Sequence, residues 1–510
     1  MKQSTKMFQR IIAALAALAT LTTLALTFTA CANDQTPDHD DTTLPNTSEP
    51  ATPETTSAFV DDDLPETLKI NDTVTFLYWS DVERPEFFID DDQNDGNIVN
   101  ARLIERNKKV EERLGVTLDW VGTKGNFNNQ KGFVEAATNS VAAGGGYDIF
   151  AGYSMTAATL AMNGLTQNLL ALDHIDFEKP WWPASLTDSA TINGKLYFTS
   201  GDISTNMLYM MYATFFNKTL FVDHHSDMTV ADLYAIANEG KWTIDKLIEL
   251  CQGIYRDDTG NGLVDYGDFY GFETIDLHFD AFFIGSDIGS VIKNADGELA
   301  ISPDYTGEKT ANLLEKVTNF LHSSGYAYAK GTVSNQSSVQ AFLAEQTIFT
   351  IDRVYIASGS LKDGSESFKY GLLPIPKYDL NQTEYKTCMA FPYTLYSVSV
   401  KARDADAAAA VLECMGSEGY RRVTPALFEQ SMKIRYSESP DDSVMYDMIK
   451  RTVVMDLGRI FTTPLANNSY APFRNAVKNN TASGWARNAK SIASVMNASI
   501  KKINEAMTGQ

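Results

Sequence analysis

The sequence lacks the short motifs that mark many enzyme classes. It contains no HExxH, GxSxG, CxxC or phosphate-binding P-loop, and its six histidines are scattered except for His224 and His225. The triglycine at 144–146 has no phosphate-loop context, so we interpret it as a flexible connector. A glycosidase needs only two carboxylates, which no local motif marks, so the many Asp and Glu residues leave that enzyme class open.

Cysteine is scarce as well. Beyond Cys31 the chain has only Cys251, Cys388 and Cys414, and an odd number without close spacing excludes a disulfide framework. Cys251 and Cys414 each share a helical face with apolar neighbours. We therefore expect them to be inert core residues rather than metal ligands or nucleophiles.

Only one long apolar run is present, at 11–28, which excludes a multi-spanning membrane protein. Lys2, Lys6 and Arg10 precede the run and small residues follow it, as in a signal peptide. The tetrapeptide FTAC at 28–31 resembles a bacterial lipobox, although Phe28 replaces the usual Leu. The resemblance implies that Cys31 carries fatty acyl chains such as palmitate and becomes the N-terminus after cleavage. Two alternatives stay open: an uncleaved anchor helix and ordinary secretory cleavage.

Residues 32–66 contain no Lys or Arg but ten acids, with many Thr and Pro. Such a segment has little apolar material to bury, so we expect a disordered, extended tether. The net charge of -23 divides into +3 for residues 1–31, -10 for the tether and -16 for the remaining 444 residues. This acidity excludes binding to nucleic acids and to anionic membrane surfaces. A hydrophobic content of 44% excludes global disorder.

From Leu68 onward, short apolar runs alternate with amphipathic helical patterns, which predicts an α/β fold built from βαβ units. The expected strands and extended apolar runs are 73–79, 116–121, 147–152, 208–216, 349–351 and 391–400. The expected helices are 98–114, 132–143, 243–254, 311–321, 339–344 and one that Asp404 caps and Gly416 ends. Ligands of such sheets bind beyond the carboxyl ends of the strands.

A series of local patterns, taken in order, resembles the extracellular solute-binding proteins of family 1, the lipoprotein receptors of ABC importers for sugars. The patterns are YDIFAGYS (147–154), NGLTQNLLAL (163–172), KPWW (179–182), NGKLYFTSGDIS (193–204), ATFFNKTLF (213–221), GKWTIDKLIEL (240–250), AFLAEQTIFTIDR (341–353) and YGLLPIPKYD (370–379). The resemblance extends over nearly all of residues 68–510.

The resemblance implies a two-lobed, periplasmic-binding-protein-like (type II) fold, in which each lobe has a mostly parallel sheet flanked by helices. Lobe one would combine 68–198 with 388–435, and lobe two 199–387 with 436–510. Crossover strands near Gly201 and Cys388 would form the hinge. The ligand would lie in the cleft between the lobes, and a ligand that contacts both lobes would favour closure.

A sugar site needs aromatic platforms beside carboxylates, guanidinium groups and amides. Trp79 and Asp81 supply such a pair after the first expected strand. By the resemblance, Tyr153 stands where the family often has an aromatic residue, and Asp202 lies where the chain crosses between lobes. The candidate ligand-binding residues are Trp79, Asp81, Tyr153, Asp202, Asp352, Arg353 and Trp485.

Residues 257–268 match the spacing of a 12-residue calcium loop. The predicted ligands are Asp257, Thr259, Asn261, Leu263 through its carbonyl, Asp265 and Asp268. Gly262 falls at the position of the tight turn, although Thr259 is a poor ligand and Asp268 reaches less far than the usual Glu. The alternative is a plain Asx-rich turn. A bound calcium ion would have a structural role, and no other cofactor is expected.

These observations predict a monomeric, lipid-anchored protein on the extracytoplasmic face of the membrane. It would capture a mono- or oligosaccharide and deliver it to the permease subunits of an ABC transporter, without catalysis. The alternatives are a surface glycoside hydrolase and a sensor or adhesin lipoprotein on the same fold.

Overall fold

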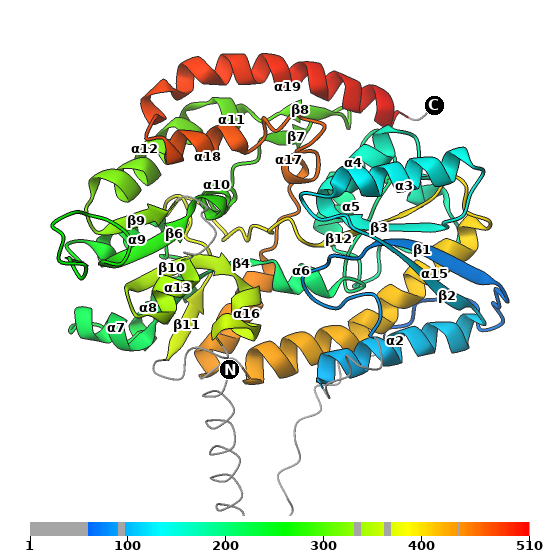
Figure 1. Cartoon of the computed structure of the whole chain (residues 1–510), viewed down its shortest axis with the longest axis horizontal. Coiled ribbons are helices and arrows are strands. Elements are labelled where there is room, and N and C mark those ends of the chain that lie inside the picture. Colours follow the sequence, from blue (N-terminus) through cyan, green and yellow to red (C-terminus); the bar gives the residue numbers. More distant parts are fainter. Residues whose placement is uncertain (1–59, 90–96, 331–337, 362–368, 436–438, 509–510) are drawn as a thin grey trace, which may run out of the picture. The chain divides into compact units, whose positions relative to one another are not determined.

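A computed structural model of the protein describes residues 60–89, 97–330, 338–361, 369–435 and 439–508. Two β-sheets with their flanking helices organise this part of the chain (Figure 1). The predicted signal peptide, the lipidation site at Cys31 and most of the tether lie outside the described residues. Over the described ranges, no helix combines the length and the apolar character needed to cross a membrane.

The sheet of lobe one has the strand order β12-β3-β1-β2. Strand β1 is parallel to β2 and β3, and β12 is antiparallel to β3. The strands and principal helices are β1 (Thr73–Trp79), β2 (Thr117–Thr123), β3 (Ile149–Tyr153), β12 (Thr394–Val398), α2 (Ile98–Leu114), α3 (Gln130–Ala142) and α4 (Ser154–Met162). The bounds of β1 and α2 match the prediction, because Asn97 caps α2 by accepting from Val99 N and Gly115 ends it with φ 60°.

The sheet of lobe two has the order β11-β4-β10-β6-β5, and β9 pairs with β6. Its strands are β4 (Tyr212–Asn217), β5 (Tyr255–Arg256), β6 (Phe269–Ile275), β9 (Ala327–Lys330), β10 (Thr347–Arg353) and β11 (Tyr370–Leu373). Only the pairs β10–β6 and β6–β9 are parallel. The prediction of a mostly parallel sheet is therefore wrong for lobe two. Strand β4 starts at the hinge and runs away from it, so β4 is antiparallel to both of its neighbours.

Helices cover the sheet of lobe two. They are α7 (Lys218–His224), α8 (Val230–Asn238), α9 (Ile244–Cys251), η3 (Asp276–His278), α10 (Phe279–Gly285), α11 (Pro303–Thr306), α12 (Glu308–Ser323), α13 (Ser338–Leu343) and η4 (Val354–Ser358). Thr243 caps α9 as predicted, since its hydroxyl accepts from Lys246 N at 3.2 Å. All three described cysteines are free and buried. A hairpin of β7 (Val291–Lys293) and β8 (Leu299–Ile301) stands apart from the main sheet.

Three chain segments run side by side between the lobes. Backbone bridges join Thr199 to Tyr396, Met211 to Met389 and Thr387 to Val453, the last in a third segment that the sequence did not reveal. The predicted strand 208–216 is partly wrong, because 205–209 form a short helix, α6 (Thr205–Tyr209). Hydrogen bonds from Ser204 and Asn206 to the buried Glu86 carboxylate bend the chain there.

Past residue 400, the chain is mostly helical. Its elements are α15 (Ala405–Glu418), the π-helical segments η5 (Gly419–Val423) and η6 (Pro425–Arg435), α16 (Pro440–Arg451), α17 (Leu457–Ile460), α18 (Ala471–Lys478), η7 (Ala482–Gly484) and α19 (Trp485–Met507). Asp404 caps α15 as predicted, but Gly416 does not end it. A Cβ at 416 would lie 2.7 Å from the Trp181 ring, so Gly416 serves close packing instead. Helix α19 packs on β8 of lobe two and reaches α4 of lobe one (Figure 1).

The predicted tether ends too late. Leu64 is buried, and the buried Asp62 carboxylate pairs with Arg113 and Arg421 of lobe one. Lys179 likewise pairs with Asp63. Asp62 and Asp63 have cationic partners far away in sequence, so residues 60–66 belong to the folded part.

Candidate functional site

The strand ends of the two sheets meet where the sequence predicted ligand-binding residues. Strands β1 and β3 end at Trp79 and Tyr153, and β10 ends at Arg353. The Arg353 guanidinium Nη1 lies 2.8 Å from Glu83 Oε2, four residues beyond Trp79. We call this region the interlobe site. Its principal residues are Trp79, Glu83, Arg84 and Tyr153 of lobe one, Asp280, Asp352, Arg353 and Tyr355 of lobe two, and Arg459 of α17.

Trp79 and Tyr153 form an aromatic pair under this site. Their ring centroids are 5.3 Å apart in an edge-on arrangement, and the Trp79 indole N–H donates to Thr394 Oγ1 at 2.8 Å. Trp79 is 0% and Tyr153 3% exposed. Burial is the main reason that the pKa of the Tyr153 hydroxyl is raised, while Arg459 acts in the opposite direction. The pair therefore supports the site from below rather than presenting open ring faces.

Side chains of the loop after β1 reach across to lobe two. The Arg84 guanidinium stacks 4.4 Å from the centre of the Tyr355 ring, and its Nη2 donates to Ser358 Oγ at 3.3 Å. Arg353 also lies over the Tyr355 ring, at 5.0 Å. Burial alone would lower the pKa of Arg353, but the neighbouring Asp352 and Glu83 carboxylates outweigh it and raise that pKa. An ion pair, a cation–π contact and a hydrogen bond thus join the two lobes at this place.

The same loop is anchored rigidly to the hinge segment behind it. The carboxylate of Glu86, which is fully buried, accepts from Ser204 Oγ, Asn206 and the Tyr396 hydroxyl at 2.7–2.9 Å. The buried Arg106 guanidinium donates to the carbonyls of Glu86, Phe87 and Ile203 at 2.9–3.0 Å. These bonds satisfy both buried charges and hold Glu83 and Arg84 at the edge of lobe one.

Two groups of charged residues line the lobe-two side. Asp352 lies 3.8 Å from His278 Nε2 and from Arg353 Nε, and burial lowers the pKa of His278. Asp280 pairs with Arg459 at 2.6 Å and also with Arg474. The Arg459 guanidinium in turn lies 3.8 Å from the centre of the Phe391 ring. Each of these carboxylates has a cationic partner, so the described charges largely cancel within the site.

Asp202 lies in a pocket beside the hinge rather than among the strand ends. Its carboxylate accepts from Thr424 Oγ1, and burial raises its pKa. The pocket has a volume of about 270 Å³ and is walled by Met207, Met211 and Met389, with Lys450 and Arg451 among its other lining residues. Asp202 therefore borders a space between the lobes but is apart from the Trp79–Tyr153 pair.

Asp81 holds a neighbouring loop in place rather than facing the interlobe site. Its carboxylate accepts from the backbone N–H groups of Gly125 and Asn126 at 2.8 and 3.0 Å and from Asn129 Nδ2 at 2.9 Å. These bonds fix the loop that follows β2. The predicted pairing of Asp81 with Trp79 as neighbouring sugar contacts is not seen, because the Asp81 oxygens point to this loop.

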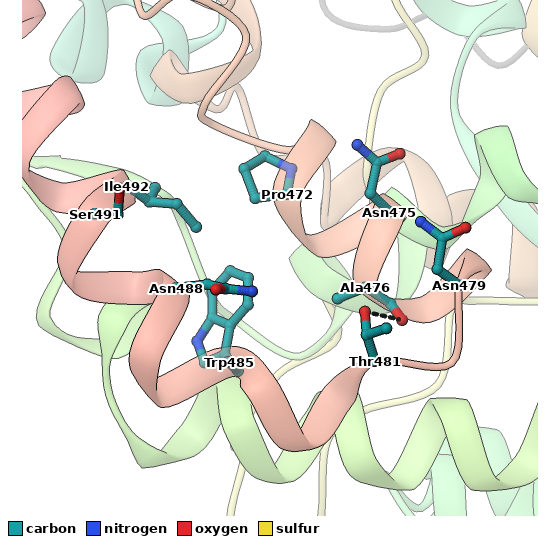
Figure 2. A pocket seen from close by; sticks show the side chains of 9 residues that line it. All are labelled: Pro472, Asn475, Ala476, Asn479, Thr481, Trp485, Asn488, Ser491 and Ile492. Carbon is teal, nitrogen blue, oxygen red and sulfur yellow. Dashed lines mark hydrogen bonds between the residues drawn. The ribbon is translucent and has the colours of Figure 1, made fainter.

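Trp485 lies in a groove of its own between α18 and α19 (Figure 2). It is 2% exposed and packs edge-on against Tyr305 of α11, with ring centroids 5.6 Å apart. The residues that line this groove include none of the interlobe site. The structure therefore separates Trp485 from the other predicted ligand-binding residues.

The predicted calcium loop is held by its own hydrogen bonds. Asp257 accepts from the N–H groups of Gly260 and Gly262 at 2.6 and 2.8 Å, and the buried Asp268 accepts from Thr259 N and the Tyr255 hydroxyl at 3.2 and 3.0 Å. Gly262 has φ 73°, as the predicted tight turn requires. Among the described residues, which include this whole loop, no three His, Cys, Asp or Glu side chains group as a metal site would require.

The other predicted ligands of this loop are also used locally. Asn261 accepts from Leu263 N at 2.7 Å and donates to Asp265 at 2.9 Å. The carbonyl of Leu263 accepts from the Tyr255 hydroxyl at 3.1 Å. The carboxylates of the loop thus do not converge as they stand, and calcium binding stays a prediction.

Sequence reasoning missed several residues of the interlobe site. Glu83 and Arg84 follow Trp79 closely, so the same strand-end rule would have found them had it been carried five residues beyond Trp79. Tyr355 follows Arg353 in the same way. By contrast, Asp280 and Arg459 stand in no motif, and only the fold brings them together.

Comparison with solved structures confirms the two-lobed α/β fold. An ABC substrate-binding protein from Listeria monocytogenes in complex with cycloalternan has a TM-score of 0.51 and 14% identity, over 86% of this chain and 100% of that chain. A cyclo/maltodextrin-binding protein complexed with maltotetraose has a TM-score of 0.52 and 13% identity, over 86% and 98%. An extracellular solute-binding protein from Staphylococcus aureus in complex with maltose has a TM-score of 0.51 and 13% identity, over 86% and 99%. No protein-family model and no curated protein matches the chain.

Proposed function

We propose that this protein is an extracytoplasmic solute-binding protein that captures a neutral mono- or oligosaccharide at the interlobe site and delivers it to an ABC permease. The observation that carries the proposal is the contact between Glu83 and Arg353, because it places polar groups of both lobes at one site. A ligand that bridges them gains affinity only when the lobes are closed. The solved structures with the same fold hold cycloalternan, maltotetraose and maltose, which supports the class of ligand.

The chemistry of the site also suits a sugar. Tyr355 and Phe391 are partly exposed beside the Arg353 and Arg459 guanidinium groups. A sugar ring can stack its C–H face on such rings while its hydroxyls bond to the charged groups at the rim. Every carboxylate described at the site already has a guanidinium partner, and Arg84 stacks on Tyr355 and bonds to Ser358 rather than to an acid, so the site favours a neutral ligand over a cation.

The rival function is glycoside hydrolysis, which needs an acid and a second carboxylate on either side of the scissile bond. The carboxylates described at this site are Glu83, Asp280 and Asp352, and each has an Arg partner. Each of these carboxylates is thus engaged in an ion pair within the protein rather than left to flank a scissile bond. This arrangement supports binding without catalysis.

Isothermal titration calorimetry of the purified protein with maltotetraose tests the proposal. We expect saturable heat at about one site per chain from the interlobe site, and no release of glucose over the course of the titration. The matched variant Arg353→Met should weaken binding at least about tenfold, the equivalent of 1.4 kcal/mol. Unchanged affinity in that variant would place the sugar elsewhere. Release of glucose that a single Asp or Glu substitution abolishes would support the hydrolase.

We further propose that Cys31 is the lipid anchor and that the segment after it holds the binding part away from the membrane. The support is the apolar run, the FTAC tetrapeptide and the absence of Lys and Arg between 32 and 66. Cys31→Ser should move the protein from the membrane fraction to the soluble fraction. A variant that stays in the membrane fraction would indicate the uncleaved anchor helix.

A further inference from the structure

The groove between α18 and α19 has a lining unlike that of the interlobe site. Its volume is about 300 Å³, and in a chain of net charge -23 it has no charged lining residue. The groove is bordered by three asparagines, two hydroxyl residues and an apolar set. These are Asn475, Asn479, Asn488, Thr481 and Ser491, with Pro472, Ala476, Trp485 and Ile492. Figure 2 shows these side chains around the space between the two helices.

The amide groups of this groove have nothing to bind within the protein. Asn475, Asn479 and Asn488 are exposed, and over the described part of the chain their amides make no hydrogen bond. Only Thr481 is engaged, through a long bond of 3.4 Å to the Ala476 carbonyl. Each amide offers two donors and an acceptor, which is the set of partners that sugar hydroxyls use.

Trp485 separates this groove from a second one of about 350 Å³ on its other side. The second groove is lined by Asn312, Asn319 and Asn480, whose amides also make no hydrogen bond in the described structure. Glu315 is its one charged lining residue. The two grooves thus display six amides around one indole.

Two buried polar groups beside the grooves have no partner either. The indole N–H of Trp485 and the hydroxyl of Thr318 make no hydrogen bond, and both side chains are 2% exposed. Buried polar groups nearly always have a partner, so each such group needs an explanation. Trp485 lines both grooves, and Thr318 lines the second.

We propose that the groove between α18 and α19 is a second binding site, for a neutral carbohydrate. The partly exposed Pro472, backed by the largely buried Ile492 and Trp485 side chains, receives the C–H face of a sugar ring, and the three exposed amides bind its hydroxyls. Binding is weak, in the millimolar range, because the groove is open to solvent. The proposal stands on these residues alone and holds whether or not the interlobe site binds sugar.

The test follows indole N–H signals by NMR in protein labelled with ¹⁵N-tryptophan, titrated with maltotetraose. The chain has six tryptophans, so Trp485→Phe and Trp79→Phe assign the two relevant signals. We expect the Trp485 signal to shift with a millimolar midpoint, both in the wild type and in Arg353→Met. The shift should disappear in Asn475→Ala/Asn479→Ala/Asn488→Ala and persist in Asn497→Ala, an exposed residue of α19 that lines neither groove around Trp485.

Two results would overturn the proposal: a Trp485 signal that does not move, or a shift that survives in the triple variant. The Trp79 signal reports on the interlobe site at the same time. A moving Trp79 signal beside a still Trp485 signal refutes the groove and leaves the proposed function standing. The reverse pattern refutes the proposed function and supports the groove. Because the three asparagines are exposed and unbonded, the triple variant should retain the melting temperature of the wild type.

Discussion

The interlobe site and the groove between α18 and α19 use polar residues in opposite ways. At the interlobe site the described carboxylates have cationic partners, as Asp280 has in Arg459. In the groove no lining residue is charged, and the amides of Asn475, Asn479 and Asn488 have no partner within the described chain. Paired charges fix the positions of the elements that carry them, whereas unpaired neutral groups are available to a ligand. Substitutions at the interlobe site should therefore lower the stability of the protein, whereas substitutions in the groove should change only ligand binding.

The largest effect is expected from Asp280→Ala. The substitution leaves the Arg459 and Arg474 guanidinium groups without the carboxylate that both contact, and Asp280 is fully buried. Removing one partner of a buried pair costs about 3 to 5 kcal/mol. We expect the free energy of unfolding, measured with urea, to fall by that amount.

Asp304→Ala is the control for this substitution. Asp304 pairs with Lys309 at 3.5 Å, but its side chain is 53% exposed. An exposed pair contributes at most about 1 kcal/mol, so the control should be nearly neutral. Equal losses for both variants would contradict the view that charges buried at the interlobe site hold the fold.

Much of the fold follows from local sequence patterns. Strand β1 and helix α2 have the predicted bounds, because β1 is a short buried run and α2 carries regularly spaced apolar residues and ends at Gly115. Predictions failed where tertiary contacts override local preference. Gly416 continues a helix because Trp181 packs against it, and residues 60–66 are folded because Arg113 and Arg421 neutralise Asp62.

The site was less predictable than the fold. The strand-end rule located Trp79 and Tyr153, and the family resemblance located Arg353, at the region where the lobes meet. The strand-end rule gave no information on burial, so Trp79 proves to be a fully buried support for the site. The pair of Asp280 and Arg459 joins residues 179 positions apart, and no local pattern encodes such a contact.

The calcium loop is an intermediate case, since its carboxylates are bonded to their own backbone rather than to cations. If calcium replaces those bonds, calcium at about a hundredfold excess over its dissociation constant should raise the free energy of unfolding by about 2.7 kcal/mol. Chelator should reverse the gain, and Asp257→Ala should abolish it. Asp258→Ala is the matched control, because Asp258 pairs with Arg256 and is not a predicted ligand. No response to calcium in the wild type would establish the Asx-rich turn.

Glu413 tests what happens to a buried carboxylate without a cation. Among the described residues it forms no ion pair, and its Oε2 accepts from the Trp182 indole at 2.8 Å and from Asp176 N at 3.2 Å. Burial raises the pKa of Glu413 from 4.5 to about 7. The folded state holds the Glu413 proton more tightly than the unfolded state does. The contribution of this proton to the free energy of unfolding is therefore complete below pH 4.5 and is lost as the pH rises to about 7.

Glu413→Gln mimics the protonated form and should remove this pH dependence. We expect the variant to exceed the wild type by roughly 3 kcal/mol in free energy of unfolding at pH 8 and to match it at pH 4.5. Urea unfolding across this range measures both. A wild-type protein whose stability is constant between pH 4.5 and 8 would show that Glu413 is ionised in the fold without cost.

The smallest change in stability is expected at the ion pair between Glu83 and Arg353. Its effect on sugar binding should distinguish it from an ordinary surface ion pair. The side chains of Arg353 and Glu83 are 24% and 34% exposed, and those of Arg422 and Glu105, a pair within lobe one, 31% and 30%. Glu83→Gln and Glu105→Gln should therefore both cost less than about 1 kcal/mol in stability. Only the first pair spans the two lobes, so only Glu83→Gln lowers the population of the closed state that a bridging ligand selects.

Calorimetry should then give a several-fold weaker affinity for maltotetraose in Glu83→Gln and an unchanged affinity in Glu105→Gln. Equal affinities in the two variants would mean that the contact between Glu83 and Arg353 has no part in closure.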